Sequence, residues 1–101
     1  MTTLGKELHE TIKNLEYIRD TKKPPPPEIY AILDQLYAIQ IELIDAAIQQ
    51  ASIEYVNATA AMQRAAKETQ QAIDDLKKLE NALEKIAIAI EKVAPLIAVA
   101  I

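Results

Sequence analysis

Residues 28–94 decide the fold of this chain, and they read EIYAILDQLYAIQIELIDAAIQQASIEYVNATAAMQRAAKETQQAIDDLKKLENALEKIAIAIEKVA. The stretch contains neither glycine nor proline, the two residues that most strongly interrupt helices. It is rich in alanine, leucine, glutamate, glutamine and lysine, which favour helix. As a single α-helix it would be about 100 Å long, at about 1.5 Å per residue. We therefore predict an all-α protein with one very long helix over about 28–94 or beyond.

Apolar residues recur along this stretch at the spacing of a coiled-coil seam, the line of contact between paired helices. Counting in heptads from Tyr30 to Ala100 gives 21 seam positions, and 19 of them are apolar, although the whole chain is only 50% hydrophobic. Only Asp34 and Thr69 are polar, and the count never slips, which favours one continuous helix. The residues that we expect in this core or interface are Tyr30, Tyr37, Ile41, Ile44, Ile48, Tyr55, Met62, Leu76, Leu79, Leu83, Ile86, Ile90, Val93 and Ile97.

Asp34 is a candidate for setting the register of the seam, because a lone polar residue among apolar ones can specify how helices align. Apolar surroundings oppose an unpaired charge. Two alternatives therefore stay open: Asp34 lies at a helix end, or it pairs with a lysine or arginine from elsewhere.

The apolar face is widest near the two ends of the stretch, at 29–48 and 82–101, whereas alanines at the seam between them would let two backbones approach closely. An antiparallel pairing centred near residue 65 brings the two wide zones together. We favour an oligomer of unbroken helices. The alternative is a chain that folds back within 57–70, at Asn57–Thr59 or Lys67–Thr69, into a three-helix bundle.

A shorter helix is predicted at the N-terminal end of the same single domain, residues 1–101. Thr3 is a suitable N-cap, and apolar residues at three- and four-residue spacing predict a helix over 4–20. Residues 22–27 form a linker with four consecutive prolines, which cannot continue a helix. The apolar stripe of this helix comprises Leu4, Leu8, Ile12, Leu15 and Ile18.

Several functional classes are disfavoured by composition. The net charge of −4 and the even spread of lysine and arginine argue against nucleic-acid binding. One glycine cannot build a phosphate-binding loop, and the chain has no cysteine, one serine (Ser52) and one histidine (His9). His9 lacks the glutamate three residues before it that a dinuclear carboxylate site would need. We expect no catalytic residues, no metal site and no cofactor.

The C-terminal residues 86–101 are the most apolar part of the chain, and the last nine of them, from Val93 on, carry no charge or hydrogen-bonding side chain. The start of the chain does not resemble a signal peptide, and no uncharged apolar run is long enough for a clear membrane span. We therefore expect a cytoplasmic protein, with signal-less secretion left open. A helix end docked in a bundle accounts for this apolar segment.

The function that we expect is that of a non-enzymatic helical interaction or assembly module, a coiled-coil or bundle scaffold. Its predicted partner is a helical protein, in the first instance a second copy of this chain. The alternative is a membrane-active helical protein that inserts residues 86–101 into a bilayer.

Overall fold

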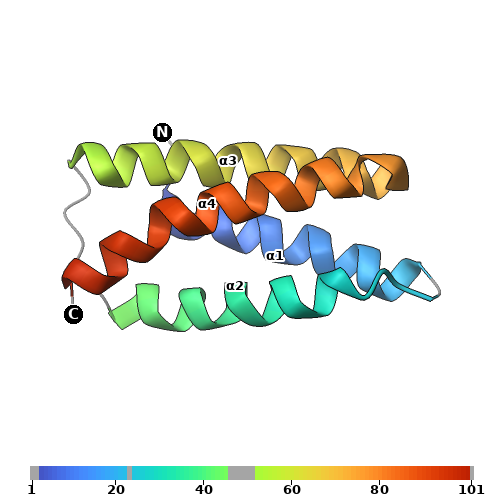
Figure 1. Ribbon diagram of the computed structural model, residues 1–101, viewed down its shortest axis with the longest axis horizontal. Coiled ribbons are helices and arrows are strands. Elements are labelled where there is room, and N and C mark those ends of the chain that lie inside the picture. The colour runs from blue at the N-terminus through green and yellow to red at the C-terminus, as the bar shows by residue number, and fades with distance from the viewer. Residues whose placement is uncertain (1–2, 23, 46–51, 101) are drawn as a thin grey trace.

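The computed structural model describes residues 3–22, 24–45 and 52–100, apart from the side chains of residues 44, 45 and 98–100 (Figure 1). Within these ranges all regular structure is helical, so the all-α prediction is confirmed. The elements are α1 (Leu4–Thr21), α2 (Glu28–Asp45), α3 (Ile53–Asp74), the short 3₁₀ helix η1 (Leu76–Lys78) and α4 (Leu79–Ala100).

The single very long helix predicted over 28–94 is wrong. The longest helices, α3 and α4, have 22 residues each, or about 33 Å at about 1.5 Å per residue. The chain measures 40 × 22 × 18 Å, far less than the length of a 67-residue helix. The predicted fold-back within 57–70 is also wrong, because α3 runs through that segment without a break.

Local hydrogen bonds explain where the helices begin and end. Ser52 has extended backbone, and its side-chain oxygen accepts from the backbone N–H of Tyr55 at 3.2 Å, which makes it the N-cap of α3. Asp75 also has extended backbone, and its carboxylate accepts from the N–H of Lys77 at 3.1 Å. Aspartate competes in this way for backbone donors, so Asp75 ends α3 and starts η1.

The N-terminal helix follows the sequence closely, since α1 runs one residue beyond the predicted 4–20. Thr3 caps it as expected, accepting from the N–H of Lys6 at 3.2 Å. Residues 24–27 lie between α1 and α2, and α2 begins directly after Pro27, where the missing N–H of proline costs no helical hydrogen bond. Pro95, by contrast, lies inside α4, and the helix continues past it to Ala100.

The four α-helices form a bundle in which each packs against two others (Figure 1). α3 and α4 are antiparallel and make the most extensive contact, α1 packs between α2 and α3, and α2 touches α4 only sparsely. The expected antiparallel pairing of 29–48 with 82–101 is wrong: α2 and α4 run in the same direction, and their antiparallel neighbours are α1 and α3.

Small side chains on both α3 and α4 contribute to the core, beside larger ones such as Met62 and Ile86. Ala65 and Ala72 of α3 and Ala82 and Ala89 of α4 are all fully buried. They lie at matching sequence distances on either side of Lys77, as expected for two helices that meet after a turn there. Small residues let helix backbones approach closely, which accounts for the extensive contact of this pair.

Two isoleucines of α4 test how the bundle is stabilised. Ile86 is fully buried, whereas Ile88 is 44% exposed. We expect Ile86→Ala to lower the free energy of unfolding by about 2–5 kcal/mol, because it leaves a cavity. Ile88→Ala should change it by less than about 0.5 kcal/mol. Urea denaturation measures both, and equal losses would contradict the packing of α4.

Candidate interaction surface

The predicted seam residues of α3 and α4 lie in the core or at its edge. The buried ones are Tyr55, Met62, Leu79, Ile86, Val93 and Ile97. Leu83 and Ile90 are partly buried against the same core. Leu76 lies in η1, between the two helices, and is 40% exposed.

In α2 most of the described seam positions lie on the outside of the bundle. Tyr30 is 51% exposed, Ile41 is 65% exposed, and Asp34 between them is also exposed. The core is filled instead by residues one position earlier in the heptad, Ile29, Leu33 and Leu36, which are buried. Tyr37 is partly buried. The side chain of Ile44, and Ile48 as a whole, lie outside the described residues.

This difference arises because α2 has apolar residues on two sides, and sequence periodicity alone does not say which one is buried. A shift of one residue turns a helix by about 100°. Since α2 and α3 are separate helices, the heptad register need not continue from one into the other. Asp34 lies in the middle of α2, so its proposed position at a helix end is wrong.

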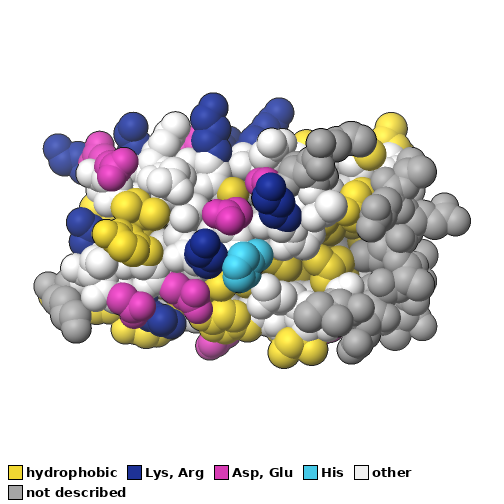
Figure 2. Space-filling model, turned by 180° about the vertical axis from the view of Figure 1, so that it is seen from behind, with side chains coloured by type: hydrophobic (Ala, Val, Ile, Leu, Met, Phe, Trp, Pro, Cys, Tyr) yellow, Lys and Arg dark blue, Asp and Glu magenta, His cyan; other side chains and the backbone are white. Residues whose placement is uncertain are grey.

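We call the group Tyr30, Asp34, Tyr37, Ala38 and Ile41 the α2 face. These residues are spaced at three, four or seven positions, which places them on one side of a helix. Ala38 is exposed as well, and Glu42 borders the group. From behind, the bundle shows hydrophobic side chains between charged ones, and along the lower edge they lie beside both acidic and basic groups (Figure 2).

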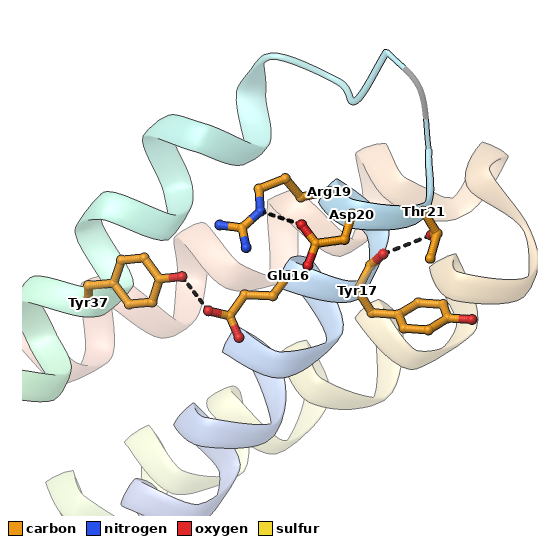
Figure 3. A network of polar contacts seen from close by, with 6 residues as sticks. All are labelled: Glu16, Tyr17, Arg19, Asp20, Thr21 and Tyr37. Carbon is orange, nitrogen blue, oxygen red and sulfur yellow. Dashed lines mark hydrogen bonds and ion pairs between the residues drawn. The ribbon is translucent and has the colours of Figure 1, made fainter.

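Tyr37 ties this face to α1. Its hydroxyl donates a short hydrogen bond to the carboxylate of Glu16 (Figure 3). Beside this pair, Arg19 forms an ion pair with Asp20 at 3.0 Å. Tyr17, one residue after Glu16, points away from Tyr37 and is 55% exposed. The Tyr37 ring is therefore held at the junction of α1 and α2.

The hydrogen bond to Glu16 raises the pKa of Tyr37 above its ordinary value, because the carboxylate favours the protonated phenol. Partial burial and the negative charge of Glu16 act in the same direction, and Arg19 opposes them more weakly. Tyr37 consequently stays neutral and hydrogen-bonded across the physiological pH range.

Polar contacts fix α1 against α3. The side-chain amide of Asn14, which is 7% exposed, donates to the carbonyl of Ala66 and to the hydroxyl of Thr69, each at 3.1 Å. The Tyr55 hydroxyl accepts from the N–H of Leu4 at 3.1 Å, at the start of α1. Sequence reasoning singled out Thr69 as a polar residue on the seam but missed Asn14, because their contact joins residues 55 positions apart.

The described residues line two open grooves along the bundle. One, of about 600 Å³, runs between α1 and α3 and carries both signs of charge, from Glu7, Glu10, Arg64 and Lys67. The other, of about 510 Å³, lies where α2 and α4 begin and is lined mainly by Pro26, Leu76, Leu79 and Leu83. Among the described residues, no three histidine, cysteine or acidic side chains are grouped to hold a metal ion. His9 is exposed.

The apolar C-terminal segment is packed into the bundle, since Ile86, Ala89, Val93 and Ile97 are buried. Of the helices in the described residues, none has both the length and the apolar character to cross a membrane. Comparison of the chain with known protein families, with characterised proteins and with solved structures finds no match.

Asn14 offers a test of the contact between α1 and α3. We expect Asn14→Ala to lower the free energy of unfolding by about 1–3 kcal/mol, because two buried hydrogen bonds are lost. The exposed neighbour Lys13 is the control, and Lys13→Ala should change stability by less than about 0.5 kcal/mol. Equal values in urea denaturation would show that these hydrogen bonds do not stabilise the bundle.

The pH dependence of Tyr37 tests its contact with Glu16. Glu16→Gln should lower the pKa of Tyr37, because a neutral amide no longer favours the protonated phenol. Ultraviolet titration measures this pKa, with Tyr37→Phe identifying the signal. In the wild type, the stabilisation should be present below the ordinary tyrosine pKa of about 10 and be lost as pH rises through the raised value. An unchanged titration in Glu16→Gln would contradict the assignment.

Proposed function

We propose that this protein is a non-enzymatic interaction module, a small helical bundle that binds a helix of a partner protein through the α2 face. The observation that carries the proposal is that α2 fills the core with one side and exposes Tyr30 and Ile41 on another. A helix that is apolar on several sides is usually covered on several sides.

The composition and arrangement of the α2 face support this proposal. Single exposed hydrophobic residues are normal on protein surfaces. Here, however, they recur along about three turns of one helix, on the same side, with Asp34 between them. Tyrosine is enriched at protein interfaces, where its ring buries apolar area and its hydroxyl keeps a polar contact. Tyr37 already has such a contact, with Glu16.

Preorganisation also favours binding at this face. The hydrogen bond between Tyr37 and Glu16 restricts the tyrosine side chain before any partner arrives, so less conformational entropy is lost on binding. α2 packs on α1 less extensively than α3 does, and it contacts α4 only sparsely. A helix docked on α2 would therefore add contacts to the least covered element of the bundle.

The finer expectations from the sequence stay predictions. One is that the partner is a second copy of the chain, which would make the module a homo-oligomer. The other is a cytoplasmic location, which is expected because the sequence shows neither a signal peptide nor a clear membrane span. Membrane insertion of residues 86–101 would require Ile86, Val93 and Ile97 to leave the core. That cost argues against the membrane-active alternative.

A neutral helical peptide tests the proposed function without assuming the identity of the partner. The probe is an alanine-rich peptide of about 18 residues, with leucines at coiled-coil seam positions and glutamines beside them. We expect it to bind, and Ile41→Asp to weaken its binding at least about tenfold, because a charge replaces an apolar contact. Fluorescence anisotropy measures binding, and amide hydrogen exchange locates it.

The matched control is Ile53→Asp, which changes an isoleucine that is 70% exposed at the start of α3, outside the α2 face. It should leave peptide binding unchanged. Circular dichroism checks that both variants keep their helices. Binding that is equally sensitive to both substitutions, or protection in hydrogen exchange away from α2, would refute the α2 face as the interaction site.

A further inference from the structure

α2 contains acidic residues but no lysine or arginine. Glu28, Asp34 and Glu42 are exposed along it, with Asp34 inside the α2 face and Glu42 at its border. Among the described residues, the one ion pair is that of Arg19 with Asp20, so these three carboxylates have no paired cation. The carboxylates beside the exposed apolar residues of α2 are therefore unpaired, and Arg19 of α1, the cation next to Tyr37, is paired with Asp20.

Asp34 determines what can cover this face. It lies between Tyr30 and Ile41, so a helix that packs on both must also remove water from the carboxylate. Dehydrating a charge without giving it a partner is costly. A lysine or arginine on the docked helix removes that cost by pairing with Asp34, and its cation can also pack against the exposed Tyr30 ring.

A second copy of the chain fits the face less well. Two α2 helices packed face to face would bring their Asp34 carboxylates together near the symmetry axis. Neither α2 helix would supply a cation, and Arg19 of α1, beside Tyr37, is already paired with Asp20. Like charges in a partly dehydrated contact repel each other. Charge complementarity therefore favours a partner of a different composition.

We infer that the α2 face binds an amphipathic helix of another protein that carries lysine or arginine beside its apolar residues. This inference rests on the proposed function and adds the chemical class of the partner. From Tyr30 to Ile41 the face is about 17 Å long, at about 1.5 Å per residue. A partner helix of three to four turns covers it, with its cations spaced to meet Asp34 and Glu42.

The test compares three peptides that differ only in the residues beside their leucines. One is the glutamine-flanked probe described above, and the other two carry lysine or glutamate at the same positions. We expect the lysine peptide to bind at least about tenfold more tightly than the glutamate peptide at low ionic strength, with the difference shrinking as salt is added. The glutamine peptide should lie between them.

A charge reversal on the protein side makes the test reciprocal. Asp34→Lys should weaken binding of the lysine peptide and strengthen binding of the glutamate peptide. Glu91→Lys changes the net charge of the protein equally but lies at an exposed position of α4, so it should leave the order of the peptides unchanged. Circular dichroism confirms that each variant is folded.

The outcomes separate this inference from the proposed function. If all three peptides bind equally at α2, the inference is wrong, although α2 still binds helices. If Glu91→Lys alters the order as much as Asp34→Lys does, net charge rather than the α2 face selects the peptide, and the inference is again wrong. If light scattering shows a dimer that Ile41→Asp dissociates, a second copy occupies the face. If no peptide binds and the protein stays monomeric, both proposals fail.

Discussion

The turn at Asp75 is the constraint on which the rest of the structure depends. Its extended backbone and its side-chain hydrogen bond to Lys77 reverse the chain between two 22-residue helices. The apolar stripes of α3 and α4, each continuous in sequence, then face each other, and buried alanines on both sides allow the backbones to approach. Because α3 and α4 bury these stripes against each other, no second chain is needed to cover this part of the seam.

Once α3 and α4 are paired, α1 is positioned by polar as well as apolar contacts. Asn14 reaches the carbonyl of Ala66 and the hydroxyl of Thr69, and Tyr55 satisfies the N–H of Leu4. Because hydrogen bonds are directional, they fix how α1 lies along α3 more strictly than hydrophobic burial would. α1 in turn presents Glu16 to Tyr37, and this hydrogen bond adds to the burial of apolar residues that holds α2 in the bundle.

α2 is the element with the least coverage by other helices, although its sequence is strongly apolar. It buries Ile29, Leu33 and Leu36 and still exposes Tyr30 and Ile41. A helix with this composition is stabilised by any partner that covers its second side. The same contact, however, removes water from the Asp34 carboxylate, which costs free energy. In our proposal the α2 face is selective because a partner that brings a cation pairs with this carboxylate and therefore binds more tightly than one that does not.

The sequence by itself determined the helical class, the N-cap at Thr3 and the limits of α1, because these depend on residues only a few positions apart. The seam predicted in α3 and α4 also lies in the core or at its edge, because these helices bury it against each other and against α1. The tertiary structure alone decided where the chain turns, which side of α2 is buried and how Asn14 meets Thr69. Heptad counting cannot detect a break between two helices when the apolar residues keep the same spacing across it. A helix with two apolar sides can bury either of them. The neighbouring helices decide which side is buried, because burial is a property of the whole bundle.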